Sequence, residues 1–523
     1  MNAGSAVNAA NANNHAGTAS AASRANGDVH TLSLSLVSHT NVGKTTLART
    51  LLGRDVGEVR DEAHVTAEAQ AHVLGLTEAG DRLLLWDTPG FGDSVRLARR
   101  LRQAQRPLGW LLGAVWDRWR DRPFWATQQV VRHVLGASDV VLYLVNASEP
   151  PEDAAYLAAE LEVLALIGKP VVALLNQVGP AGHEDEPLQA AWVQRWRAQL
   201  QAQPVVQAVL TLDAFSRCWV HEGVLWHTIA PLLPADRRPA FGRLQAAWAQ
   251  AQQARWAQAM AELSRRLARA ALDREPVAEA GWRGRLTGWW QTFARKPGDQ
   301  PPPIDRAMVT LAERLDADVR ASTIALITLH GLEGDAGREV LTRLARHYAV
   351  RQPLDEGRAA LWGGLVTGAL AGLKADLATG GLTMGGGLLA GGVLGALTAA
   401  GAARGVNKLR GIDTPEVAWD AEVLNLLLAN ALLGYLAVAH HGRGRGAWVA
   451  TEPPRAWTDS VAGVLEAQEA AFTQLWRRRQ VLLADAGTEA DNPSVLAWQG
   501  DLQRQVARAG EALLRRLYPQ AAW

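Results

Sequence analysis

The chain has 523 residues, enough for two to four domains, and it carries 53 Lys and Arg residues against 52 Asp and Glu residues. A net charge of +1 gives no overall attraction to a polyanion, and the single cysteine, Cys218, excludes both an internal disulfide and a cysteine-based metal site. Residues 1–28 are mostly Ala, Asn, Gly and Ser and lack the apolar core of a secretory signal, so we predict a disordered tail.

A strand, a tight loop and a helix are predicted in succession from residue 30. Leu32, Leu34 and Leu36 alternate as in a strand, and a helical run follows from Lys44. The loop between them is close to the phosphate-binding pattern G-x-x-x-x-G-K-[ST], with Ser38 in place of the first glycine, where we expect some strain. Backbone N–H groups and the helix N-terminus would cradle phosphate. The predicted nucleotide contacts are Ser38, His39, Thr40, Asn41, Val42, Gly43, Lys44, Thr45 and Thr46.

Three further features predict how a triphosphate and its metal would be held. Lys44 would reach the β- and γ-phosphates, and the Thr45 hydroxyl would bind Mg²⁺. Thr66 lies at the distance past the loop from which a threonine can close over the γ-phosphate and coordinate Mg²⁺. An ordinary loop threonine at this position, and the weaker candidate Thr77, stay open as alternatives.

Two strands, 71–76 and 82–86, are predicted to be joined by a turn, and the second leads into Asp87-Thr88-Pro89-Gly90. Asp87 would hold Mg²⁺ through water, and the Gly90 N–H would bond the γ-phosphate. We therefore assign catalysis to Lys44, Thr66 and Gly90, and magnesium binding to Thr45, Thr66 and Asp87.

These motifs resemble those of the Era-like (TrmE–Era–Der) P-loop GTPases, of the bacterial group whose G domain precedes a long uncharacterised helical region. The resemblance covers residues 30–235 and implies an α/β fold with a mostly parallel six-stranded sheet and helices on both faces. It implies a Mg²⁺-dependent GTP hydrolase acting as a slow molecular switch, because Phe91 stands where Ras-type enzymes carry a water-positioning glutamine. In relatives an asparagine at the position of Asn41 holds K⁺. The alternative role of Asn41 is to stabilise the loop by hydrogen bonds.

The resemblance also places base recognition at the ends of two later strands, predicted at 170–175 and 205–212. Asn176 and Gln177 stand where GTPases carry Asn-Lys-x-Asp, but Gly179 replaces the aspartate that accepts two hydrogen bonds from guanine. Discrimination against adenine should therefore fall by a few kcal/mol, and the preference for GTP over ATP stays open. Ala214 is expected to offer its N–H to the base, and Asp213 to replace part of the missing acceptor.

The remaining chain is predicted to be mainly α-helical. We divide the chain into the tail, a G domain at 29–235, a helical connector at 236–300 with a basic, Trp-rich segment, and an α-helical domain at 301–523. Within the last domain, glycines recur every four residues in 359–405, so we predict a glycine-zipper hairpin whose helices approach closely.

Two interpretations of the uncharged runs at 377–403 and 423–439 stay open. The glycine-zipper hairpin at 359–405, which contains the first run, is either inserted in the inner membrane or packed tightly in a soluble helical domain, and the run at 423–439 follows it as a further uncharged segment. We expect a cytoplasmic protein, associated with the inner membrane under the first interpretation. The expected partners are GTP and GDP, an inner-membrane lipid or membrane protein, and a second copy through the switch face, with no DNA. The competing functions are a nucleotide-dependent membrane scaffold and an RNA-modification or ribosome-assembly GTPase.

Overall fold

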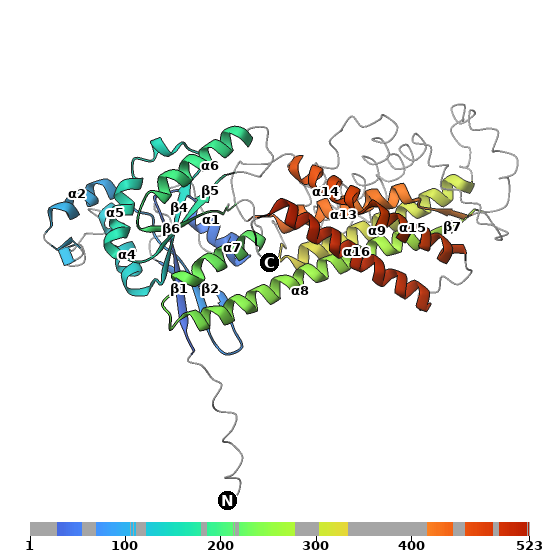
Figure 1. Cartoon of the computed structure of the whole chain (residues 1–523), viewed down its shortest axis with the longest axis horizontal. Coiled ribbons are helices and arrows are strands. Elements are labelled where there is room, and N and C mark those ends of the chain that lie inside the picture. Colours follow the sequence, from blue (N-terminus) through green and yellow to red (C-terminus); the bar gives the residue numbers. More distant parts are fainter. Residues whose placement is uncertain are drawn as a thin grey trace, which may run out of the picture.

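The computed structural model describes residues 29–54, 69–104, 106–107, 109–110, 122–178, 186–212, 214, 219–277, 303–332, 416–442, 455–484, 491–519 and 521. Thr66, Gly179, Asp213, the predicted tail and the predicted hairpin at 359–405 lie outside these described residues. Figure 1 shows an α/β half and a helical half side by side, with the long helix α8 running from one into the other.

Six strands form one sheet in the order β2-β3-β1-β4-β5-β6. Only β2 and β3 pair antiparallel, and the other neighbours are parallel. The inner strands β4 and β5 are continuous apolar runs that are buried on both faces, as a parallel sheet requires. The predicted mostly parallel six-stranded sheet is therefore confirmed. The strand bounds are β1 Thr31–Ser38, β2 Gln70–Leu76, β3 Arg82–Asp87, β4 Val140–Asn146, β5 Val171–Asn176 and β6 Val206–Thr211.

Helices cover both faces of this sheet (Figure 1). One face carries a core that includes Val131, Leu164 and Trp196, and the other a core that includes Leu47 and Leu225. The helix after β4 begins at Leu157 and follows a short 3₁₀ turn. The helix bounds in this half are α1 Lys44–Leu52, α2 Ser94–Gln103, α4 Arg122–Ala137, α5 Leu157–Ile167, α6 Glu186–Gln201 and α7 Trp219–Ile229, with 3₁₀ turns η1 Pro151–Asp153 and η2 Ala230–Leu232.

The helix α8, Arg238–Leu272, belongs to both halves of the molecule. Its first turns bury Phe241 and Leu244 in the same core as the strands β1 and β3. Its last turns bury Met260, Leu263 and Leu267 in the core of the helical half. A single rigid helix of 35 residues therefore connects the two cores.

The helical half is a bundle around α8 (Figure 1). It consists of α9 Pro303–Leu329, α13 Ala421–Ala439, α14 Arg455–Ala467, α15 Glu469–Ala484 and α16 Pro493–Leu517. A small antiparallel pair, β7 Arg274–Pro276 with β8 Glu416–Ala418, was not predicted by the sequence pattern. Among the described helices, α13 alone is long and apolar enough to cross a membrane, by length and composition only. Within the bundle 44% of its apolar window is buried, and the core helices of soluble proteins pass the same test of length and composition.

Candidate functional site

The loop between β1 and α1 closes at the edge of the sheet where the parallel strands end. Gly43, which precedes α1, has a left-handed backbone with φ of 93°. A Cβ at this position would lie 2.9 Å from Asn176 Nδ2, so a side chain does not fit. The expected strain at Ser38 is wrong, because Ser38 is the extended last residue of β1, and among the described residues other than glycine only Asn41 and Gln177 have positive φ.

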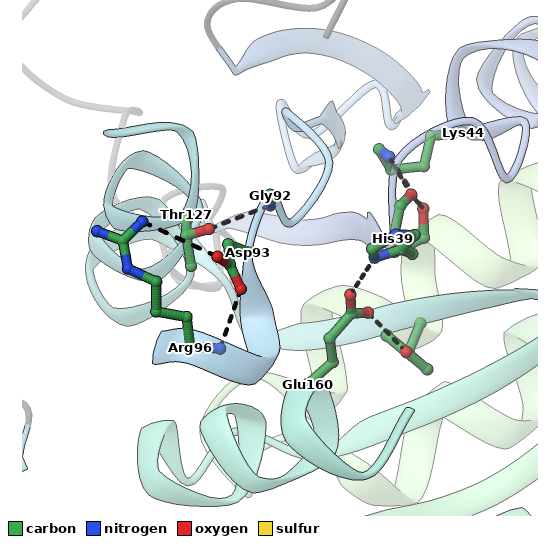
Figure 2. A network of polar contacts seen from close by, with 9 residues as sticks. His39, Lys44, Gly92, Asp93, Arg96, Thr127 and Glu160 are labelled. Atoms are coloured by element: carbon green, nitrogen blue, oxygen red, sulfur yellow. Dashed lines mark hydrogen bonds and ion pairs between the residues drawn. The ribbon is translucent and has the colours of Figure 1, made fainter. Parts of the chain in front are cut away.

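The ammonium group of Lys44 lies inside this loop. Lys44 Nζ donates to Ser38 Oγ at 2.9 Å and to the His39 carbonyl at 3.2 Å, as Figure 2 shows. Burial lowers the pKa of Lys44, while the carboxylates of Asp87 and Glu160 act in the opposite direction. The Ser38 hydroxyl supplies an acceptor that glycine would lack. A buried cation held by neutral oxygen atoms can exchange them for phosphate oxygens, which bind it more strongly.

A threonine hydroxyl and a buried carboxylate lie together at the end of β3. Thr45 Oγ1 donates to Asp87 Oδ2 at 2.6 Å. Asp87 is buried, which raises the pKa of its carboxyl group, and its Oδ1 atom has no hydrogen-bond partner. A buried carboxylate oxygen without a donor, next to a hydroxyl group, fits a hard cation such as Mg²⁺. Thr45 and Asp87 would hold this ion, which would supply positive charge to neutralise the phosphates.

Within the described ranges, no group of three or more His, Cys, Asp and Glu side chains could hold a metal ion. This finding is compatible with the proposed magnesium position, because a phosphate-bound Mg²⁺ needs few protein carboxylates and keeps oxygen ligands from phosphate and water.

The segment after β3 lies directly against the phosphate-binding loop. A Cβ added to Gly90 would lie 2.9 Å from the Thr40 Cα atom, so this contact requires glycine. The next residue, Phe91, donates its N–H to the Ser38 carbonyl at 2.9 Å, and its ring is fully buried. The Phe91 side chain therefore faces the core and is not available to orient a water molecule at the γ-phosphate.

The residues after Phe91 are fixed by neighbouring helices. Gly92 N–H donates to Thr127 Oγ1 of α4 at 3.2 Å, and Asp93 caps α2 by accepting from the Arg96 N–H at 3.0 Å (Figure 2). The guanidinium group of Arg96 lies 4.0 Å above the ring of Phe124. These contacts seat the beginning of α2 beside the loop.

The predicted base-binding residues meet at the end of β5. Asn176 Nδ2 donates to the Val42 carbonyl at 2.8 Å, and Asn176 Oδ1 accepts from the Ala214 N–H at 2.9 Å. The Ala214 N–H is therefore engaged by Asn176 and not directed at a base, contrary to expectation. A Cβ on Gly43 would lie 3.7 Å from Gln177 Nε2, so the Gln177 amide lies beside the loop. Asn176 thus ties the phosphate loop to the loop after β6.

Thr77 does not belong to this site. Its hydroxyl donates to Asp81 Oδ2 at 3.1 Å in the turn between β2 and β3, at the opposite end of the hairpin from Asp87. Of the two candidate switch threonines, only Thr66 remains as a prediction, and it lies outside the described residues.

The sequence pattern missed a buried glutamate behind the loop. Glu160 of α5 accepts from Tyr143 OH at 2.7 Å and is 2.7 Å from His39 Nδ1. The available signal was a carboxylate within the apolar run that forms α5, but only the fold shows that this residue meets the loop.

Two families match separate parts of the chain. Residues 33–177 match the family described as 50S ribosome-binding GTPase, and residues 345–503 match a domain of unknown function, DUF3482. Among curated proteins, no relative matches the sequence. The chain therefore carries a GTPase domain that includes the loop, the Asp87–Gly90 segment and Asn176, and the predicted GTP hydrolase class is confirmed.

Several solved structures are similar to the chain. Era from Aquifex aeolicus, bound to GDP and AlF4⁻, is 19% identical with a TM-score of 0.27, and the match covers 39% of this chain and 57% of that chain. Toc33 from Arabidopsis thaliana is 14% identical with a TM-score of 0.24, covering 36% of this chain and 72% of that chain. A bacterial dynamin is 10% identical with a TM-score of 0.23, covering 92% and 77%. At these scores the likenesses carry no argument about function.

Proposed function

We propose that the chain is a magnesium-dependent GTP hydrolase that works as a slow molecular switch. The observation that carries the proposal is the meeting of Lys44, Thr45, Asp87 and Asn176 at the carboxyl edge of the sheet, with one buried oxygen of Asp87 unpaired. Ligands bind at this edge in open parallel sheets, since loops and helix N-termini converge there.

The chemistry is the attack of water on the γ-phosphate. Negative charge develops on the phosphoryl oxygens, and the Lys44 ammonium and the loop N–H groups are placed to stabilise it. Magnesium, when bound by Thr45 and Asp87, supplies further charge neutralisation. Since the Phe91 ring is buried, it cannot orient the attacking water, and intrinsic turnover should be slow.

Potassium at Asn41 is the finer part of the proposal. Asn41 is exposed on the loop with φ of 63°, a conformation that asparagine tolerates better than most residues. Its exposed amide oxygen is available to a monovalent cation beside the phosphates. Such a cation would add positive charge at the γ-phosphate.

The output of the switch would pass through α8. Arg243 of α8 forms a paired hydrogen bond with the buried Asp81 in the β2–β3 turn, at 2.7 and 2.9 Å. This turn belongs to the hairpin that ends in Asp87, the proposed magnesium ligand. A shift of the hairpin with nucleotide state would therefore act on the helix that continues into the bundle.

Hydrolysis of GTP in KCl and in NaCl tests both parts of the proposal. We expect magnesium-dependent release of phosphate that is faster in KCl, and release that is at least about a hundredfold slower in Lys44→Ala. Equal rates in the two salts would remove the potassium site and leave the hydrolase. Absence of magnesium-dependent hydrolysis in both salts would contradict the proposed function.

A ribosome-associated role is a second candidate, favoured by the family description that residues 33–177 match. Co-sedimentation with 50S subunits tests it. Binding that appears with a non-hydrolysable GTP analogue and disappears with GDP is the expected result for this candidate, and equal recovery in both states would count against it.

A further inference from the structure

The glutamate behind the phosphate loop is buried and held on both sides. The Glu160 side chain has no exposed surface, and burial raises the pKa of its carboxyl group. One carboxyl oxygen accepts from Tyr143 OH at 2.7 Å, and the other lies 2.7 Å from His39 Nδ1. Figure 2 shows Glu160 reaching from its helix to the His39 ring. Two partners on opposite oxygens fix the orientation of this carboxyl group.

His39 is held in turn by Glu160 and by an aromatic ring. The imidazole stacks on Tyr156 with ring centroids 4.2 Å apart and an angle of 11° between the planes. Its backbone carbonyl accepts the hydrogen bond from Lys44 Nζ. The side chain of His39 therefore anchors the main-chain segment that also seats the catalytic lysine.

The main-chain segment at His39 and Thr40 forms the side of the nucleotide loop that lies next to Gly90 and Phe91. Gly43 to Thr46 stand at the start of α1, where the N–H groups of a helix bind phosphate. His39 forms a β-bridge with Phe91, and Thr40 contacts Gly90, the residue proposed to bond the γ-phosphate. The His39 side of the loop would thus lie beside the γ-phosphate, whereas the N–H groups at the start of α1 would bind the phosphates common to GTP and GDP.

We propose that His39, anchored by Glu160, is a positioning residue that fixes the γ-phosphate side of the loop. The inference rests on the proposed GTP hydrolase function and assigns a further role within the same site. Loss of the anchor frees the main chain beside Gly90 and Lys44. It should weaken contacts to the γ-phosphate, in the bound triphosphate and in the transition state, while contacts to the diphosphate remain.

A pair of substitutions at one position isolates the hydrogen bond. His39→Ala removes the donor and the ring, whereas His39→Asn removes the ring but retains an N–H donor near the position of Nδ1. We expect His39→Ala to lower the affinity for a non-hydrolysable GTP analogue, and kcat, about tenfold, the size expected for loss of a hydrogen bond to a carboxylate. GDP affinity should change less than about threefold, and His39→Asn should recover most of the loss.

His133 offers a matched control in the same half of the molecule. Its imidazole also makes one hydrogen bond, to Ser35 Oγ at 3.0 Å, and one ring contact, to Trp86 at 4.5 Å, but beneath β1 and away from the loop. His133→Ala should lower the melting temperature as His39→Ala does and leave the ratio of GTP-analogue to GDP affinity unchanged. The affinities are measured with fluorescent nucleotides, and stability by thermal unfolding.

The inference is overturned if His39→Ala moves both affinities equally, if His133→Ala moves the ratio as much, or if His39→Asn restores nothing. Should His39→Ala fail to fold, Glu160→Leu against Glu160→Gln tests the same bond from the other side, since glutamine keeps an acceptor. A lower ratio of GTP-analogue to GDP affinity in Glu160→Leu, with an unchanged ratio in Glu160→Gln, supports the anchoring role of Glu160. The same ratio in both variants overturns it. If the unaltered protein binds neither nucleotide, the proposed function fails, and this inference fails with it.

Discussion

Buried polar side chains are distributed differently in the two halves of the molecule. In the α/β half, Lys44, Asp87, Glu160 and Asn176 are all buried and gather at one edge of the sheet. In the described part of the bundle, Arg266 pairs with Ser322 Oγ at 3.0 Å, and the buried His440 at the end of α13 pairs with Tyr518. Buried polar groups that converge, with one oxygen left unpaired, indicate a binding site, whereas dispersed pairs indicate packing.

The bundle also contains a buried arginine that serves a helix end. Arg479 of α15 donates through Nε to the Ala271 carbonyl in the last turn of α8, and burial lowers its pKa to about 10. A cation at a helix C-terminus is favoured by the helix dipole. This contact stabilises the C-terminal end of α8 inside the bundle and needs no ligand to explain it.

The comparison predicts its largest effect on stability in the bundle. Trp498 is fully buried and donates from Nε1 to the Leu475 carbonyl at 3.0 Å. Trp498→Ala should lower the free energy of unfolding by about 3 to 5 kcal/mol, because it leaves a large cavity in the bundle core. Chemical denaturation measures the loss. The nucleotide affinity of the folded fraction should be unchanged. A loss of affinity would contradict the claim that the bundle contributes to stability and not to nucleotide binding.

For Lys44 in the loop we expect a large loss of activity without a loss of stability. Lys44→Ala should reduce kcat/KM for GTP about a hundredfold to a thousandfold, the range seen when a main source of transition-state stabilisation is removed. Its thermal stability should stay the same or rise, since a buried charge is lost. Lys169→Ala, near the start of β5 at the other edge of the sheet, is the matched control. Retained hydrolysis in Lys44→Ala would remove the loop from the catalytic account.

A smaller, pH-dependent effect is expected where the two halves are linked. The hydrogen bonds from Arg243 lower the pKa of Asp81 from 3.8 to about 2. Since the folded-state pKa lies below the unfolded one, the carboxylate contributes stability above pH 3.8, and this contribution is lost as the pH falls towards 2. Asp81→Asn should lower the melting temperature at neutral pH by a few degrees and flatten its decline in this window. If the melting temperature of Asp81→Asn falls with pH as steeply as that of the unaltered protein, the assigned role of the Asp81–Arg243 pair is contradicted.

The smallest effect is expected for an exposed ion pair on the α/β half. Arg102 of α2 bonds both oxygens of Glu162, at 2.8 and 2.5 Å, but its side chain is 64% exposed. Exposed pairs are screened by water and salt and lose side-chain entropy when they form. Arg102→Ala should therefore leave the melting temperature unchanged within error in differential scanning calorimetry. A loss as large as that of Asp81→Asn would show that exposure is a poor guide here.

The sequence predicted local patterns well and distant contacts poorly. The loop before α1, the hairpin ending at Asp87 and the apolar inner strands are continuous segments whose spacing determines their structure. The contact of His39 with Glu160 joins residues 121 positions apart, so no periodicity predicts it. The bonding of the Ala214 N–H to Asn176 was missed for the same reason.

The helical half shows the same limit in another form. Helical spacing predicted α8 but could not show that its two ends belong to different cores, because both ends present the same alternation of apolar and polar residues. The three-residue strands β7 and β8 are too short for a period to be recognised, and they pair across a separation of 142 positions.

The most direct test of the account is calorimetric titration of the purified protein with GTP and with ATP, each with and without Mg²⁺. The central claim, that Lys44, Thr45 and Asp87 grip a metal-bound triphosphate, predicts binding of GTP that requires Mg²⁺, disappears in Lys44→Ala, and exceeds the binding of ATP by a margin that Gly179 makes small. Binding of neither triphosphate in the presence of Mg²⁺ would contradict the claim.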